Sequence, residues 1–592
     1  MSGSVANTLW ARSFADELAR VGVREVVIAP GSRSTPLVMA FAADGRFRTR
    51  VHLDERSAAF FALGVGKASG RPAVVVTTSG TAVANVFPAV VEASLSGVPM
   101  LVLTADRPHR LRDSDANQAI DQVQIYGGFV RAFHDVAPPT VERGALRHLR
   151  GLANRAFATA TGPDAGPVHL NFPFDKPLEP ASDSDLEAEL ALAGMGRPDD
   201  VPFTDITVGR PAATPAQIEA FEGVVGIARG VIVAGPSEDA DRHGKAVLEF
   251  ASATGFPVLA DPLSGARFGP TGGAYVVAAY DLFLRDDAVR RRLAPGVIVR
   301  VGASPTSAAL QGWLEHHSET PHVVIDGSGR WKDHGAIASH YVRADPAETL
   351  ARLAAGRVRG EVGVSADAEW VEAWRVAEAA ALRAIAENSG GEWEPHEGDV
   401  LAAVLRAVPA GANLFVSSSM PIRDLDAFGH PTGEVTHVFA NRGASGIDGI
   451  LSTAFGVASQ RSTPTVCVVG DIAFFHDQNG LLWSREDDAS VVFVLIDNDG
   501  GGIFHRLPIA EHDPHFTRFF ATPHGIELKH AAAAHGIDFT QVGVSDIGDA
   551  LARALSDGRT QILCVRTDRE VNHRRHLEVE QAVARSVREA LG

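Results

Sequence analysis

Short apolar runs that end in small or polar residues recur along the chain and alternate with longer amphipathic segments. Residues 25–29, 72–78 and 100–104 are the first such runs, and each is followed by a turn rich in Gly, Ser or Pro. Residues 5–20 and 58–68 have the apolar spacing of helices. Runs of this length predict buried strands, and the strand, turn and helix alternation predicts a doubly wound parallel sheet.

The same alternation returns twice more along the 592 residues. A chain of this length is expected to form about three domains of ~150 to 200 residues each. An acidic, polar stretch and an Ala/Glu-rich, helix-like stretch separate the strand patterns and are predicted to be linkers. We therefore predict three doubly wound α/β domains of the parallel-sheet type, at residues 1–180, 201–355 and 396–592, with linkers at 181–200 and 356–395.

Composition and charge exclude several classes of protein. The 45% hydrophobic and 21% charged residues are typical of a globular chain. A formal charge of -18 argues against nucleic-acid binding, which needs a basic face. No apolar stretch approaches the ~20 residues that cross a membrane, and the N-terminus lacks a basic segment before a long apolar run. With only Cys467 and Cys564, a reducing compartment is expected, and the cytoplasm is the default.

Two predicted strands of the last domain end in oxygen donors. Residues 465–469 lead to Gly470-Asp471, and residues 491–496 lead to Asp497-Asn498-Asp499 and a run of three glycines. The Asp471 carboxylate and the Asn498 side-chain oxygen suit Mg²⁺, with Mn²⁺ as the alternative, and such an ion completes its shell with phosphate and water. The glycines let the Gly500 carbonyl turn toward the metal and expose amides to phosphate. The other interpretation is an ordinary Gly-rich turn after a core strand.

Glu55 and four arginines are the other candidates for chemistry. Glu55 lies between a strand and an apolar helix, so its carboxylate is expected to be partly buried, or to be a helix-start carboxylate favoured by the dipole. Arg33, Arg107, Arg423 and Arg442 lie at predicted strand ends or loops. Guanidinium groups offer bidentate contacts to carboxylates. For any one of these arginines taken alone a surface position is the better expectation, because arginine is mostly exposed, so the argument rests on their occurring together.

Taken together, these motifs resemble those of the thiamine diphosphate enzymes. The Gly-Asp pair, the helix pattern after it and the Asn-containing strand end resemble the cofactor signature, although Asp497 stands where many members have an Asn. Glu55, the TTSGTAVAN segment of residues 77–85 and the TADRP segment of residues 104–108 resemble the pyrimidine-binding domain. The resemblance implies bound thiamine diphosphate with Mg²⁺, a Glu55 that bonds the aminopyrimidine ring, a pyrimidine-binding first domain, an architectural central domain and a diphosphate-binding last domain.

Further segments resemble one narrower family, the menaquinone-pathway synthases. They are PGSRSTPL (30–37), HLDERSAAFFALG (52–64), ANQAI (116–120), SSSMPIRD (417–424) and NRGASGIDG (441–449). The resemblance implies a transferase that decarboxylates 2-oxoglutarate and adds the succinyl unit to isochorismate, giving a succinylated cyclohexene. It also implies at least a homodimer, because Glu55 and the metal residues belong to different subunits in this superfamily. Dimer and tetramer both remain open.

The resemblance also assigns roles to single residues. Catalytic roles fall to Glu55, Arg423 and Arg442, and the metal ligands are Asp471, Asn498 and Gly500. The cofactor is expected to contact Glu55, Ser419, Met420, Ile447, Gly470, Asp471, Ile472, Asn498, Gly500, Gly501 and Ile503. The expected contacts of 2-oxoglutarate are Ser419, Arg423 and Arg442. The expected contacts of isochorismate are Ser32, Arg33, Arg107, Asn117 and Gln118. Ile503 and Phe504 are expected to close the pocket. His476 and His505 receive no catalytic role, and Ser307 and Ala308 receive no substrate contact.

Two alternatives differ from this interpretation. One is another thiamine diphosphate enzyme, such as an acetolactate synthase-like lyase, which would also bind flavin, or a simple 2-oxo acid decarboxylase. The set of arginines favours substrates with more negative charge. The other is a catalytically silent binding or regulatory subunit, against which the presence of Glu55, Asp471 and Asn498 argues.

Overall fold

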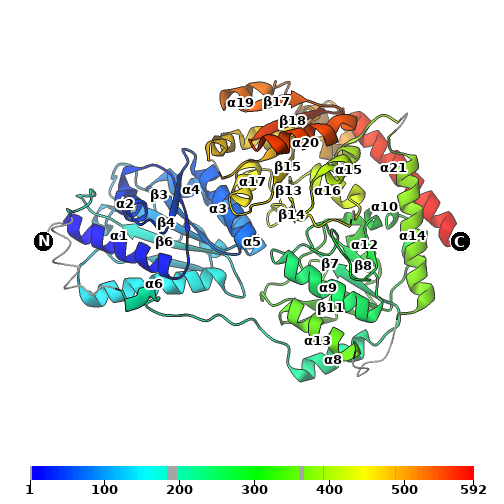
Figure 1. Cartoon of the computed structure of the whole chain (residues 1–592), viewed down its shortest axis with the longest axis horizontal. Helices are drawn as coiled ribbons and strands as arrows, with labels where there is room; N and C mark the ends of the chain where they lie inside the picture. The colour runs from blue at the N-terminus through cyan, green and yellow to red at the C-terminus, as the bar shows by residue number, and fades with distance from the viewer. Residues whose placement is uncertain (1–2, 183–195, 359–365, 391–392, 432, 487) are drawn as a thin grey trace. The chain divides into compact units, whose positions relative to one another are not determined.

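The computed structural model describes residues 3–182, 196–358, 366–390, 393–431, 433–486 and 488–592. Within these ranges the chain forms three six-stranded sheets, in which every pair of neighbouring strands is parallel (Figure 1). Helices lie on both sides of the sheets, so the predicted α/β class is confirmed. The predicted linker at 181–200 lies largely outside the described residues.

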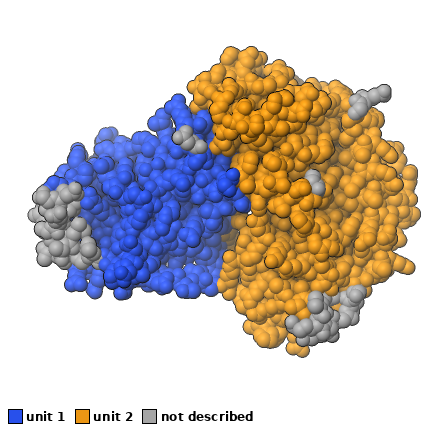
Figure 2. Space-filling view, viewed as in Figure 1, with its two compact units in different colours: residues 1–209, 441–462, 477–489 blue, residues 210–440, 463–476, 490–592 orange. Residues whose placement is uncertain are grey.

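The chain divides into two compact units (Figure 2). The first contains residues 1–209, 441–462 and 477–489, and the second contains residues 210–440, 463–476 and 490–592. Two short segments from the last third of the chain therefore belong to the same unit as the N-terminal sheet. The predicted helix-like stretch at 356–395 contains a long helix of the second unit, α14 (Ala368–Glu387).

The first sheet has its strands in the order β2-β1-β3-β4-β6-β5. In that order the bounds are Arg48–Val51, Glu25–Ile28, Ala73–Thr77, Met100–Asp106, Pro167–Pro173 and Ala132–Asp135. The helices of this unit are α1 (Gly3–Arg20), α2 (Thr35–Ala43), α3 (Glu55–Ser69), α4 (Thr81–Asn85), α5 (Phe87–Ser96), α6 (Arg143–Thr161) and α17 (Ile450–Ala458).

Alternate residues of these strands face opposite layers of helix. Val26 and Ile28 of β1 and Val74 and Val76 of β3 share one buried cluster with residues of α1, α2 and α6. The residues between them, such as Val27, are also fully buried, and α3 packs on the same strands. Burial on both faces explains why these strands are continuous apolar runs in the sequence.

Helix α17 packs along α3 within the first unit, and glycines set how closely the two approach. A Cβ added at Gly456 would lie 2.1 Å from the Phe61 carbonyl oxygen, and one added at Gly64 would lie 2.1 Å from the Thr453 carbonyl oxygen. Only glycine leaves room for backbones at this separation. The contact anchors residues 441–462 beside the helix that begins at Glu55.

The second sheet has the order β12-β11-β10-β7-β8-β9. In that order the strands are His340–Val342, His322–Ile325, Val297–Val301, Gly230–Ala234, Val258–Ala260 and Val276–Val277. The helices of this part are α8 (Pro215–Val225), α9 (Ala240–Thr254), α10 (Tyr280–Phe283), α11 (Asp287–Arg292), α12 (Ala308–His316), α13 (Pro346–Val358) and α14. Trp370 and Trp374 of α14 enter a buried cluster with this part, so α14 is part of the core.

The third sheet has the order β14-β13-β15-β16-β18-β17, which repeats the strand order of the first sheet. In that order its strands are His437–Phe439, Asn413–Val416, Thr465–Gly470, Val492–Asp497, Gln561–Arg566 and Asp538–Gln541. The helices around it are α15 (Glu397–Ala407), α16 (Met420–Phe428), α18 (Asp471–His476), α19 (Lys529–Ala534), α20 (Ile547–Asp557) and α21 (Arg569–Leu591). Among the residues that the structure describes, no helix has both the length and the hydropathy needed to traverse a bilayer.

Candidate active site

Two adjacent strands of the third sheet end at the predicted metal residues. In the parallel register Gly470, the last residue of β15, pairs with Ile496 of β16. The carboxyl ends of the two strands therefore lie side by side, at the edge where ligands bind in sheets of this kind. Asp471 begins α18 directly after β15, and Asn498 follows β16. The structure thus brings to one edge of the sheet the two residues that the sequence placed at separate strand ends.

The Asp471 carboxylate is buried and held by backbone groups. Its Oδ2 accepts a hydrogen bond from the Gly500 amide at 2.9 Å, and its Oδ1 accepts one from the Ile472 amide at 2.7 Å. Burial raises the pKa of Asp471, and these hydrogen bonds act in the opposite direction. A buried carboxylate of this kind gains most from a cation, because nearby positive charge offsets the cost of its desolvation.

The nitrogen and the oxygen of the Asn498 side-chain amide lie in different surroundings. Its Nδ2 donates to Oε1 of Glu397 at 2.7 Å. Its Oδ1 is buried and has no hydrogen-bond partner among the described residues. A buried acceptor that is left unsatisfied costs about 1 to 3 kcal/mol and calls for a specific explanation. A divalent cation with oxygen ligands supplies one, so the residues present fit the predicted metal.

The glycines after Asn498 are required by close contacts. Gly500 has a φ of +145°, and a Cβ there would lie 2.2 Å from the Ala521 carbonyl oxygen. Its own carbonyl oxygen accepts a hydrogen bond from the Gly502 amide at 3.0 Å, which leaves its second lone pair for another partner. At Gly470, by contrast, no described atom lies within 4 Å of the position of a Cβ. That open space lies at the strand end where a phosphate is expected.

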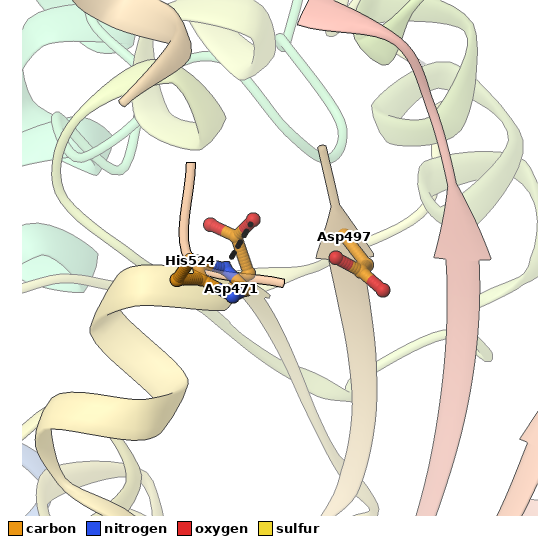
Figure 3. A group of neighbouring side chains, drawn as sticks. All are labelled: Asp471, Asp497 and His524. Atoms are coloured by element: carbon orange, nitrogen blue, oxygen red, sulfur yellow. Dashed lines mark hydrogen bonds and ion pairs between the residues drawn. The ribbon is translucent and has the colours of Figure 1, made fainter. Parts of the chain in front are cut away.

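His524 belongs to the same cluster and was missed by the sequence interpretation. Its Nε2 lies 3.2 Å from Oδ2 of Asp471, and the dashed line in Figure 3 marks this interaction. Asp471, Asp497 and His524 each offer one ligand atom, and these three atoms lie within 4.8 Å of one another. They form a second possible donor set for a metal. The sequence holds no local signal for His524, because it follows Asp471 by 53 positions, outside any strand or helix.

Ile503, a predicted cofactor and pocket residue, and Phe504, predicted only to close the pocket, lie in a short 3-10 helix, Gly502–Arg506, after the glycine loop. Ile503 and Phe504 are half-buried there, and the Phe504 ring meets that of Phe520 with centroids 5.8 Å apart. Gly501 is held in place because its amide donates to the Ala521 carbonyl at 2.7 Å. Two apolar side chains therefore follow the predicted metal residues closely in the sequence.

Ser419, Met420 and Arg423 lie where β13 turns into α16. Ser419 is the residue before the helix and has a φ of +75°, a conformation that is strained for any residue other than glycine. Met420 is buried, and an Arg423 guanidinium nitrogen donates to the Ser419 carbonyl at 2.6 Å. Strain of this kind concentrates at functional sites, which supports the prediction that this turn contacts ligands.

Glu55 is the first residue of α3 in the other unit. Asp54 caps this helix by accepting from the Arg56 amide at 2.9 Å, so the capping role is already filled. One Glu55 carboxylate oxygen accepts from the Asn85 side chain at 3.1 Å, and the residue is half-buried. The carboxylate is therefore oriented by Asn85 and keeps capacity for a further hydrogen bond.

The residues predicted to meet isochorismate are grouped at the strand ends of the first sheet. Arg107 donates to the Ser79 hydroxyl at 2.8 Å and to the Asn117 carbonyl, and the Gln118 amide donates to the Ser79 carbonyl at 3.1 Å. Arg33 donates to the Phe174 carbonyl at 2.9 Å. Burial and then the charge of Arg107 lower the pKa of Arg33, so the two guanidinium groups act on each other. Two neighbouring cations of this kind form a site suited to an anion. Ser32 is exposed directly before Arg33.

Arg442 and Ile447 belong to the loop before α17, in the same unit as Glu55. The buried carboxylate of Glu92, in α5, holds this loop by accepting from the Gly443 amide at 2.8 Å and the Ala444 amide at 2.7 Å. Sequence reasoning missed Glu92, because the two hydrogen bonds span 351 and 352 positions. Ser419 and Arg423, which were predicted to share the oxoglutarate site with Arg442, belong to the other unit.

A parallel α/β fold with oxygen donors at adjacent strand ends is the arrangement expected of a thiamine diphosphate enzyme, and sequence comparison places the chain in that class. Residues 10–125 match the "Thiamine pyrophosphate enzyme, N-terminal TPP binding domain" family. Residues 202–416 match the family described as "Middle domain of thiamine pyrophosphate", and residues 428–565 match the "Thiamine pyrophosphate enzyme, C-terminal TPP binding domain" family.

Full-length relatives identify the family more narrowly. The chain is 45% identical over 587 residues to the 2-succinyl-5-enolpyruvyl-6-hydroxy-3-cyclohexene-1-carboxylate synthase of Halobacterium salinarum, covering 97% of this chain and 98% of that protein. Identity is 45% to the synthase of Roseiflexus castenholzii (95% and 96% covered) and 42% to that of Geobacillus kaustophilus (99% of both). The chain belongs to the family of 2-succinyl-5-enolpyruvyl-6-hydroxy-3-cyclohexene-1-carboxylate synthases, and the resemblance stated from its motifs is confirmed.

Proposed function

We propose that the chain decarboxylates 2-oxoglutarate and adds the remaining succinyl unit to isochorismate, forming 2-succinyl-5-enolpyruvyl-6-hydroxy-3-cyclohexene-1-carboxylate in menaquinone biosynthesis. The observation that carries this proposal is 42 to 45% identity, across nearly the whole chain, to synthases of that name. The reaction releases one CO₂, forms one carbon–carbon bond between the two substrates and takes up one proton. It requires a cofactor that can hold the electron pair left by decarboxylation.

Thiamine diphosphate with Mg²⁺, or with Mn²⁺, is the proposed cofactor. When bound, it supplies a nucleophilic carbon that adds to a 2-oxo acid and stabilises the charge left after loss of CO₂. Asp471, Asn498 and the Gly500 carbonyl would hold the metal, which is supported by the Asn498 Oδ1, a buried atom with no hydrogen-bond partner in the described part of the chain. The remaining cofactor contacts would come from Ser419, Met420, Ile447, Gly470, Ile472, Gly501 and Ile503.

Glu55 would bind the aminopyrimidine ring and hold a proton there. Its orientation by Asn85, at 3.1 Å, and its freedom from the capping role support this assignment. A half-buried carboxylate that is kept in one orientation can favour one tautomer of a nitrogen heterocycle, because the hydrogen bond fixes where the proton lies.

The arginines would bind the carboxylates of the two substrates. We propose that Ser32, Arg33, Arg107, Asn117 and Gln118 contact isochorismate, and the mutual effect of the two guanidinium groups supports an anion there. Ser419, Arg423 and Arg442 would receive the distal carboxylate of 2-oxoglutarate, with Ile503 and Phe504 keeping water from the reacting atoms. Charge-assisted hydrogen bonds from arginine give both strength and orientation.

We further propose a cytoplasmic homo-oligomer, either a dimer or a tetramer. Residues 1–180 would bind the pyrimidine, residues 396–592 would bind the diphosphate, and residues 201–355 would serve a mainly architectural role. Residues 181–200 and 356–395 connect these parts in sequence, the latter through the core helix α14. Light scattering of the purified protein at several concentrations tests the assembly. A mass equal to one chain at all concentrations would contradict it.

A product assay with omission of single components tests the reaction. Purified protein is incubated with Mg²⁺, thiamine diphosphate, 2-oxoglutarate and isochorismate, and each component is left out in turn. We expect the succinylated cyclohexene only in the complete mixture. Release of CO₂ at a rate that does not depend on isochorismate, or turnover with pyruvate in place of 2-oxoglutarate, would contradict the proposed substrate pair. Either result would still agree with thiamine diphosphate as the cofactor.

A further inference from the structure

A buried glutamate accepts a hydrogen bond from the side-chain nitrogen of the predicted metal ligand Asn498. Glu397 is the first residue of α15 and is 1% exposed. Its Oε1 accepts from Asn498 Nδ2 at 2.7 Å and from the Thr567 hydroxyl at 3.1 Å. Its backbone amide donates to Oδ1 of Asn572, in α21, at 2.9 Å. Two hydrogen bonds therefore hold the carboxylate itself, and a third holds the backbone of the same residue.

The contact decides which end of the Asn498 amide faces outward. A glutamate Oε1 that already receives a hydroxyl proton is an acceptor, so the amide must present its NH₂ group to it. The amide oxygen is then directed to the opposite side, where it is buried and no residue that the structure describes bonds to it. Space around the nitrogen is also limited, because a Cβ at Gly502 would lie 2.9 Å from Asn498 Nδ2.

We propose that Glu397 is a positioning residue for the metal site, which orients the Asn498 amide so that its Oδ1 faces the divalent cation of the cofactor. The inference rests on the proposed function and deepens it. Ligand side chains in metal sites are commonly held by partners of this kind, and removing such a partner typically lowers metal affinity 10- to 100-fold. A partner of this kind raises metal affinity because the ligand side chain does not have to be reoriented when the metal binds.

The decisive comparison is between Glu397→Met and Glu397→Gln. Methionine has a similar length but offers no strong acceptor, so the Asn498 amide loses its anchor. Glutamine keeps an acceptor oxygen at the same distance. Mg²⁺ affinity is measured by calorimetry at saturating thiamine diphosphate, and Mn²⁺ binding without substrates is followed by electron paramagnetic resonance. We expect Glu397→Met to bind either metal at least about tenfold more weakly, and Glu397→Gln to bind it nearly as well as the wild type.

Glu378 offers a matched control for the loss of a buried carboxylate. It is also buried, and it accepts from the backbone amides of Ala278 and Ala279. Glu378→Met should lower thermal stability without changing Mg²⁺ affinity. If Glu397→Met fails to fold, Glu397→Asp replaces it, since aspartate keeps the charge but withdraws the carboxylate by one methylene; we expect the same loss of affinity.

The outcomes separate this inference from the function on which it rests. Wild-type affinity in both folded Glu397→Met and Glu397→Asp would overturn the positioning role and leave the proposed function intact. An equal loss of metal affinity in Glu378→Met would also overturn it, because the effect would then follow from destabilisation alone. A wild-type protein that binds neither Mg²⁺ with thiamine diphosphate nor Mn²⁺ would overturn both proposals.

Discussion

The imidazole Nε2 of His524 lies 3.2 Å from Oδ2 of Asp471, across 53 positions of the chain. The same Asp471 oxygen accepts from the Gly500 amide, so one carboxylate oxygen ties the segment around His524 to the glycine loop. The imidazole either supports Asp471 as a hydrogen-bond partner or joins it as a metal ligand. The two roles predict different metal preferences, because nitrogen donors favour transition metals whereas Mg²⁺ prefers oxygen.

His524→Gln separates these roles. If His524 supports Asp471, glutamine can still donate a hydrogen bond, so Mg²⁺ affinity should fall less than about tenfold, whereas Asp471→Ala should abolish binding. Mg²⁺ and Zn²⁺ affinities are measured by calorimetry for the wild type and both variants. A selective loss of Zn²⁺ binding in His524→Gln, with Mg²⁺ binding unchanged, would instead identify the cluster of Asp471, Asp497 and His524 as the metal site.

Glu55→Gln should separate cofactor binding from cofactor activation. The amide keeps a similar shape, so thiamine diphosphate should still bind, but a neutral side chain no longer favours the required tautomer. Proton exchange at C2 of the bound cofactor should slow by about a hundredfold or more. NMR measures this rate as the exchange of the C2 proton for deuterium. Exchange at the wild-type rate with normal cofactor affinity would rule out the assigned role.

Arg423→Ala should weaken binding of 2-oxoglutarate. A hydrogen bond to a charged group contributes about 1.5 to 3 kcal/mol, so the KM for 2-oxoglutarate should rise roughly 10- to 100-fold while the KM for isochorismate changes little. Arg406→Ala serves as a matched control, because Arg406 is an exposed arginine of α15. Thermal unfolding of both variants is measured as well. If the loss of unfolding free energy in Arg423→Ala equals the free energy that corresponds to its rise in KM, Arg423 is structural.

Local patterns in the sequence predicted the elements of the site better than the partners within it. The runs that end at Asp471 and Asn498 could be predicted as strands, because a short continuous apolar run bounded by turn residues is itself the signal of a buried strand. Glu397 and Glu92 could not be predicted, because their hydrogen bonds to Asn498 and to Gly443 span 101 and 351 positions. Such pairs depend on the order of strands in a sheet, which periodicity does not encode.

The close approach of α3 and α17 predicts opposite effects for two glycine substitutions. In Gly456→Ala the new Cβ would lie 2.1 Å from the Phe61 carbonyl oxygen, which should destabilise the protein by about 1 to 3 kcal/mol. Gly151 lies within α6, and no described atom is within 4 Å of a Cβ placed there. Gly151→Ala should therefore stabilise the protein by about 0.5 to 1 kcal/mol. Thermal unfolding of both variants checks the pair, and equal changes of the same sign would contradict the packing argument.

Glu378 makes stability depend on pH in a direction that can be stated in advance. Burial raises the pKa of Glu378 to about 7, although the Ala278 and Ala279 amides oppose the shift. Its ordinary pKa is about 4.3, so the folded state binds the proton more tightly than the unfolded state. The stability that protonated Glu378 contributes is therefore fully present below about pH 4 and is lost as the pH rises through about 7.

A neutral side chain at position 378 should remove this dependence. Relative to the wild type, Glu378→Gln should gain about 2 to 3 kcal/mol of unfolding free energy between pH 5 and pH 9, because only the wild type must ionise a buried group. Urea unfolding at the two pH values, followed by tryptophan fluorescence, measures the difference. Substitution of the exposed Glu142 by Gln is the control and should show no such change. A Glu378→Gln curve parallel to that of the wild type would show that the carboxylate is ionised throughout, with the two backbone amides outweighing its burial.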